Sequence, residues 1–149
     1  MKPLRKQGCG GPYEGLGEMV SVGAKGETKV LWTTRWFAAQ RQVHLHAKGV
    51  YVVRVGAGGH LKLSDRHDGL LFYKKGKLLK RWSTKALIRD PSKVRFRDAL
   101  PKGCVSSYRF LRTIEGFKGS SFQVQTVDGD TLTFDIRTGK LTRRTPLTK

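Results

Sequence analysis

The chain has 149 residues, of which 30 are lysine or arginine and 11 are aspartate or glutamate, so its formal net charge is +19 at pH 7. This length supports one domain with a hydrophobic core and is too short for two domains of ordinary size. Hydrophobic residues make up 38% of the chain in short, scattered groups, which excludes wholesale disorder and a transmembrane helix of eighteen or more apolar residues.

The N-terminal segment differs in composition from the rest of the chain. Residues 1–18 are rich in glycine and poor in large apolar side chains, which predicts a loose arm before a single domain over residues 19–149. Lys2 and Arg5 are typical of the start of a signal peptide, but glycines follow where an apolar segment is required. The chain as given therefore shows no export signal, and a mature exported form is the alternative.

Short groups of β-branched and aromatic residues follow the arm. Each group is about five residues long, the usual length of a strand. The predicted strands cover residues 19–22, 28–33, 42–46, 50–55, 70–74, 77–83, 108–113, 121–126, 131–136 and 140–145.

Glycines separate several of these predicted strands. The pairs Lys75-Gly76, Asp128-Gly129 and Thr138-Gly139 each lie between two strand-like segments, where glycine supplies the positive φ of a tight turn. On both sides of Asp128-Gly129, apolar and polar residues alternate over 122–126 and 132–136. This alternation predicts a hairpin with one apolar face.

One short helical turn is predicted near residues 84–88. Ser83 or Thr84 is a suitable N-cap, and the Asp90-Pro91 pair stops the turn because the residue before proline resists helical angles. Together the elements predict an all-β fold, with antiparallel hairpins packed as a sandwich or as an incomplete, strongly twisted propeller-like sheet.

The C-terminal hairpin also carries a resemblance. Residues 124–141, with the turn sequence Asp135-Ile136-Arg137-Thr138-Gly139-Lys140, resemble strands of a β-propeller blade, and residues 69–83 repeat the theme loosely. Together with the Leu87-x-x-Asp90-Pro91 segment, they are similar to uncharacterised, often exported bacterial proteins that carry blade-like hairpins. The resemblance implies a type of fold and does not imply an activity. Because a closed propeller needs at least four blades of about forty residues, this chain cannot close a ring alone.

Basic residues gather in the middle of the chain. Thirteen of the lysines and arginines fall between Lys74 and Arg112, where only Asp90 and Asp98 are acidic. This uneven charge favours an extended anionic partner, so we predict a non-catalytic binding or assembly module for a polyanion, above all RNA or DNA. The alternative is a solvated face that keeps a β protein soluble. The predicted anion-binding residues are Lys74, Lys75, Lys77, Lys80, Arg81, Lys93, Arg95 and Arg97.

Two further patterns support a nucleic-acid partner. In an extended segment, Lys93, Arg95 and Arg97 lie on one face about 6.5 to 7 Å apart, a spacing close to that of phosphates along a nucleic-acid strand. Trp82 and Tyr108 are interleaved with the cations and are predicted to stack on unpaired bases.

Histidines offer a weaker alternative, a metal-dependent enzyme. His44 and His46 are two residues apart, so on a strand they point to the same side, and His60 and His67 with nearby aspartates are candidate further ligands. Because this spacing is common by chance, we expect no metal and no cofactor.

The remaining candidate sites are poorly supported. The glycine-rich loop 56–60 lacks a complete phosphate-binding fingerprint, and Cys104 shares its loop with two serines without any diagnostic spacing to a base. Cys9 and Cys104 are either thiols or, in an exported protein, a disulfide. An exported envelope or protein-interaction domain is therefore the second functional prediction.

Overall fold

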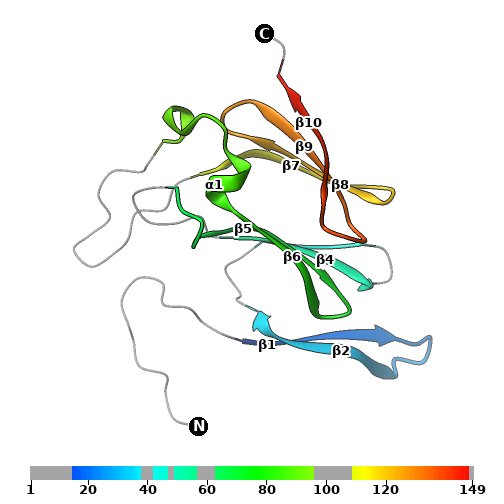
Figure 1. The fold of residues 1–149 in the computed structure, drawn as a ribbon. Helices are drawn as coiled ribbons and strands as arrows, with labels where there is room; N and C mark the ends of the chain where they lie inside the picture. The colour runs from blue at the N-terminus through cyan, green and yellow to red at the C-terminus, as the bar shows by residue number, and fades with distance from the viewer. Residues whose placement is uncertain (1–14, 38–41, 47–48, 57–62, 96–108, 148–149) are drawn as a thin grey trace, which may run out of the picture.

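The computed structural model describes residues 15–37, 42–46, 49–56, 63–95 and 109–147. These residues form ten antiparallel strands and very little helix, which confirms the predicted all-β class (Figure 1). The strands are β1 (Gly15–Val22), β2 (Thr28–Phe37), β3 (Val43–Leu45), β4 (Tyr51–Val55), β5 (Asp68–Lys74), β6 (Lys77–Ser83), β7 (Leu111–Lys118), β8 (Ser121–Thr126), β9 (Asp130–Asp135) and β10 (Leu141–Pro146); the helical turns are α1 (Thr84–Leu87) and the 3₁₀ turn η2 (Pro91–Lys93).

Every predicted strand is present, with some different ends. β6 and β8 have the predicted bounds, whereas β1 begins at Gly15, inside the segment predicted to be an arm. β7 runs to Lys118, beyond the predicted end at Thr113. Residues 1–14 of the predicted arm lie outside the described residues.

The strands form three antiparallel sheets. β1 and β2 make an N-terminal hairpin, β3 to β6 make a middle sheet, and β7 to β10 make a C-terminal sheet. In both four-stranded sheets each strand lies beside its neighbours in sequence, so each sheet is a meander. The middle sheet lies between the N-terminal hairpin and the C-terminal sheet (Figure 1).

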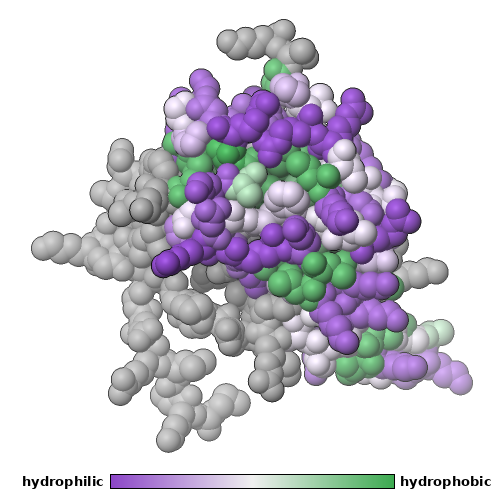
Figure 2. Space-filling model, viewed as in Figure 1, coloured by the Kyte–Doolittle hydropathy of each residue, from purple (hydrophilic) through white to green (hydrophobic). Residues whose placement is uncertain are grey.

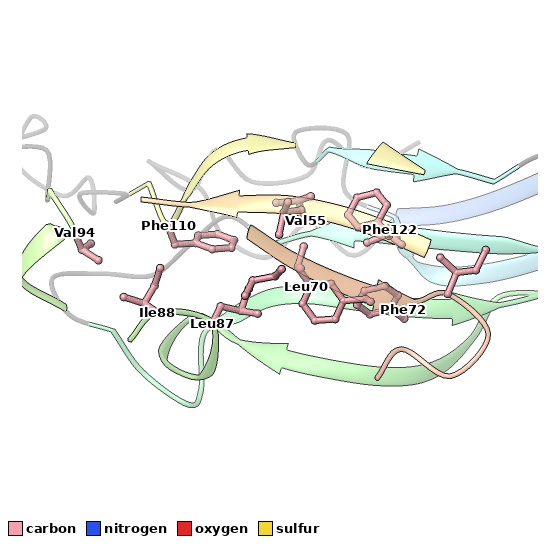
Figure 3. Close-up of a cluster of buried hydrophobic side chains, with 13 residues drawn as sticks. Val55, Leu70, Phe72, Leu87, Ile88, Val94, Phe110 and Phe122 are labelled. Atoms are coloured by element: carbon pink, nitrogen blue, oxygen red, sulfur yellow. The ribbon is translucent and has the colours of Figure 1, made fainter. Parts of the chain in front are cut away.

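The main core fills the space between the middle and C-terminal sheets. Strands β8 and β9 alternate buried and half-buried residues, which places Phe122 and Phe134 on the inner face, as the sequence predicts. Their rings meet Phe72 of β5, with centroid distances of 6.2 and 5.2 Å. Figure 3 shows Phe72 and Phe122 at one end of this core and Leu87, Ile88 and Val94 at the other.

A smaller core lies on the opposite face of the middle sheet. Val52, Leu71 and Tyr73 are buried there, with Trp32 of β2 packed against them. The Trp32 indole Nε1 donates a hydrogen bond to the backbone oxygen of Gly49 over 3.0 Å. Because both faces of the middle sheet are covered, β4 and β5 are buried along nearly their whole length rather than at alternate residues.

The segment after β6 closes one end of the main core. Ser83 is the N-cap of α1 and its hydroxyl accepts a hydrogen bond from the Ala86 backbone N–H, which confirms the predicted helical turn. Farther along, the Asp128 carboxylate accepts hydrogen bonds from the backbone N–H groups of Arg89 and Asp90 at 2.7 and 3.0 Å. The β8–β9 turn thus holds this segment in place. We call this end of the molecule the α1 end.

Candidate polyanion-binding surface

Three hairpin turns lie at the end opposite α1. They are the β5–β6 turn (74–77), the β7–β8 turn (118–121) and the β9–β10 turn (135–141), and we call this region the turn end (Figure 1). In the first turn, Lys75 and Gly76 both have positive φ, 48° and 78°, as a type I′ hairpin turn requires. Lys74 and Lys77 are therefore opposite each other and Lys75 is at the tip.

The β9–β10 turn packs directly on β6. The Asp135 carboxylate accepts hydrogen bonds from the Arg137 backbone N–H and the Thr138 hydroxyl, both over 3.1 Å. Gly139 follows with φ at 68°, and a Cβ at this position would lie 2.5 Å from the Cβ of Lys80. Lys140 therefore follows Gly139, the residue that lies against Lys80.

Aromatic contacts attach the β7–β8 hairpin to the same end. Phe117, next to Lys118, lies 5.3 Å from the ring of His46, which in turn lies 6.1 Å from the ring of Tyr51. Tyr51 pairs with Lys74 across β4 and β5. These contacts bring together the strand ends that flank the β5–β6 and β7–β8 turns, although the two turns are far apart in sequence.

The turn end carries far more cations than carboxylates. Lys118 pairs with Glu115 at 2.6 Å and Arg137 with Asp135 at 3.2 Å, whereas the five other basic side chains make no ion pair with any described residue. Those five are Lys74, Lys75, Lys77, Lys140 and Lys80, all exposed. We count Lys80 of β6 with the turn end because it lies against Gly139 of the β9–β10 turn. Because positive charges gather here without acidic partners in the described part of the chain, this end attracts anions.

The two carboxylates at the turn end stay ionised. Hydrogen bonds from the Lys118 side chain, and then from Gln125, hold the pKa of Glu115 below its ordinary value. The backbone N–H of Arg137 is the main cause of the lowered pKa of Asp135. Each carboxylate is already engaged, so neither is available to neutralise the five lysines.

At the α1 end, by contrast, several cations are ion-paired with aspartates. Asp68 binds Arg54 at 2.9 Å and Arg81 at 2.6 Å, and Arg81 also donates to the backbone oxygen of Asp65. The exposed Asp65 side chain pairs with Lys85, whose hydrogen bond is the main cause of the lowered pKa of Asp65.

A second set of ion pairs at the α1 end is centred on Asp130. Its side chain is 1% exposed and binds Arg89 at 2.7 Å and Arg144 at 2.9 Å. Nearby, burial tends to raise the pKa of Asp128, but hydrogen bonds from Thr126 and from the backbone of Asp90 and Arg89 lower it overall.

The structure divides the predicted anion-binding residues into two groups. Lys74, Lys75, Lys77 and Lys80 come together at the turn end, whereas Arg81 points to the α1 end and is held by Asp68. The predicted extended segment that places Lys93, Arg95 and Arg97 on one face is wrong at Lys93. This residue lies in η2, a 3₁₀ turn capped by the Asp90 side chain. Arg95 is exposed after a buried Val94, and Arg97 lies outside the described residues.

Trp82 is not placed for stacking on a base. Its indole Nε1 donates to the backbone oxygen of Gly139, and its ring packs against Phe134 with centroids 5.6 Å apart. The Lys80 ammonium lies 5.6 Å from the centre of the same ring. Tyr108 lies outside the described residues.

The histidines do not form a metal centre in the described part of the chain. His44 and His46 both face the C-terminal sheet, but their rings pack on Phe122 and Phe117 at 5.4 and 5.3 Å. No group of three or more potential metal ligands occurs among the described residues, which include His67. His60 lies outside them, as do Cys9, Cys104 and most of the glycine-rich loop.

Comparison with known protein families, curated proteins and solved structures finds no match for this chain. The resemblance to blade-like bacterial proteins therefore stays a prediction, and the meander order of the sheets is too widespread to support it. The described helical turns are too short to cross a membrane.

Proposed function

We propose that this protein is a non-catalytic module that binds a polyanion, foremost nucleic acid, through the turn end. The observation that carries the proposal is the gathering of lysines without ion pairs at the turn end. Asp68 and Asp130 engage four arginines at the α1 end, while five exposed lysines from two hairpins gather at the turn end without an acidic partner among the described residues.

The chemistry of the five lysines fits contact with phosphates. An ammonium group is a compact charge with three donors on a flexible stem, and it binds a phosphate without fixed geometry. Neutralising phosphates releases condensed counterions, so the affinity depends strongly on salt and little on base sequence. The turn end therefore suits recognition of the nucleic-acid backbone.

Titration of fluorescently labelled oligonucleotides tests this proposal. For duplex DNA, five phosphate contacts give a slope of about −4 to −5 in log Kobs against log salt concentration. Single-stranded DNA and RNA with the same number of phosphates test whether the protein prefers duplex or single strands, and DNA or RNA. Negligible affinity for all of them at about 50 mM salt, or affinity that salt does not change, contradicts the proposal.

A further inference from the structure

The outer edge of β6 has no strand partner in the described part of the chain. β6 is the last strand of the middle sheet and pairs with β5 alone among the described strands. Its first five residues, 77–81, are all exposed. Figure 1 shows β6 at the front of the molecule, and Figure 2, in the same view, shows its side chains uncovered. An exposed edge presents backbone N–H and C=O groups that can pair with another chain.

Two leucines form an apolar patch on this edge. Leu78 is 52% exposed and Leu79 is 37% exposed. The pairing register shifts between Phe72 and Tyr73, so that Leu79 is left without a partner on β5. Figure 2 shows hydrophobic surface over this part of β6, surrounded by hydrophilic side chains. Adjacent exposed leucines on an edge strand are typical of a surface that binds another polypeptide.

The charges around the leucines specify the kind of partner. Lys77 precedes the two leucines and Lys80 follows them, and neither forms an ion pair with a described residue. No carboxylate occurs in β6 or in its turn with β5. A basic segment would be repelled, while an acidic segment with alternate apolar residues satisfies both the lysines and the leucines.

We propose that β6 binds an extended, acidic segment of a partner protein as an additional strand of the middle sheet. Backbone hydrogen bonds give this mode its affinity, and the leucines and lysines give its specificity. The proposed peptide site shares Lys77 and Lys80 with the turn end. It does not rest on nucleic-acid binding, because contacts to phosphates do not need Leu78, Leu79 or the backbone edge.

A peptide with modified backbone amides tests the proposed pairing without changing the protein. The probe is a labelled eight-residue peptide that alternates glutamate and valine, titrated at low salt and followed by fluorescence anisotropy. Two further versions carry N-methyl groups either on every glutamate or on every valine. Because a strand bonds to one neighbour through alternate residues, one version should lose about tenfold or more in affinity while the other retains it.

Protein variants supply a matched second test. Leu78→Ser and Leu79→Ser should each weaken peptide binding and leave oligonucleotide binding unchanged, whereas Leu147→Ser, at a leucine that is also 52% exposed, should leave both unchanged. The proposal is overturned if the unmodified peptide does not bind, if both methylated versions bind equally, or if the β6 leucine variants bind the peptide as well as the parent protein does.

Discussion

The indole Nε1 of Trp82 donates a 2.8 Å hydrogen bond to the backbone oxygen of Gly139, which is 57 residues away in the sequence. This bond joins the edge strand of the middle sheet to the β9–β10 turn of the C-terminal sheet. It also brings Lys80 and Lys140 to the same surface. The geometry of the turn end therefore depends on a contact between the two sheets.

Replacing Trp82 separates this structural role from base stacking. Trp82→Phe keeps an aromatic ring against Phe134 but removes the hydrogen bond, so we expect a loss of about 1 kcal/mol in the free energy of unfolding. Oligonucleotide affinity should stay unchanged, since the half-buried ring is already engaged by Phe134 and Lys80. Urea denaturation and anisotropy measure the two effects. A large drop in single-strand affinity with unchanged stability would restore Trp82 as a stacking residue.

Gly139 is predicted to tolerate no side chain. Gly139→Ala combines a φ of 68° with a Cβ only 2.5 Å from the Cβ of Lys80 and 3.0 Å from that of Phe72, so we expect a loss of about 2 to 4 kcal/mol. Gly119→Ala is the matched control, because Gly119 also has positive φ but no atom within 4 Å of the added Cβ. Its loss should be about 1 kcal/mol. Equal losses in the two variants would show that the contact with β6 contributes nothing.

Much of the fold was predictable because its hairpins are local. The Lys75-Gly76, Asp128-Gly129 and Thr138-Gly139 turns need glycine for reasons of backbone geometry alone, and the alternation around the second turn defines the buried face. By contrast, the burial of both faces of the middle sheet depends on Trp32 and the N-terminal hairpin. No local pattern shows that these two sheets meet.

Asp130 is predicted to stabilise the α1 end. Asp130→Asn keeps the shape of the side chain but removes the charge that binds Arg89 and Arg144, so we expect a loss of about 2 kcal/mol in the free energy of unfolding. Asp65→Asn removes the carboxylate of an exposed pair with Lys85 and should cause no measurable change. Thermal or urea denaturation compares them. Equal stability of the two variants would contradict the assigned role of Asp130.

His44 is predicted to make the protein less stable in mild acid. Its Nε2 atom is buried without a hydrogen-bond partner in the described part of the chain, and burial lowers the pKa of His44 below its ordinary value of 6.5. The unfolded chain therefore binds a proton more readily than the folded protein as the pH falls below 6.5. Stability contributed by neutral His44 is present above this pH and is lost toward the lower pKa of the folded state.

His44→Phe tests this dependence because phenylalanine keeps the contact with Phe122 and cannot titrate. The free energy of unfolding of the parent protein should fall more steeply between pH 7 and pH 5 than that of the variant. Between pH 8 and pH 7 the difference between the two proteins should be nearly constant, which serves as the control. Parallel pH profiles over the whole range would contradict the prediction.

The candidate site was predictable only in part. The four lysines of the β5–β6 hairpin are close together in sequence and could be assigned directly, but Lys140 joins them only through the contact between Gly139 and β6. Arg81 and Arg89 are bound by aspartates that lie 13 and 41 residues away in the sequence, so they are not available to an anionic partner. Such distant pairs, and the capping of η2 by Asp90, leave no signal in the spacing of the basic residues.

The account rests on the charges of the turn end, and neutralising them tests it most directly. The test variant changes Lys74, Lys75, Lys77, Lys80 and Lys140 to glutamine. The matched control changes five exposed cations that also have no ion pair with a described residue but lie elsewhere, namely Arg66, Lys93, Arg95, Arg109 and Arg112. Both variants carry the same net charge, so any difference between them reflects position.

The measurement is the slope of log Kobs against log salt concentration for one duplex oligonucleotide and three proteins. The account predicts that the turn-end variant loses about one unit of slope for each phosphate contact removed, with a corresponding loss of affinity at low salt. The control variant should stay close to the parent protein. Equal losses in the two variants, or a greater loss in the control, would show that the turn end is not the binding surface.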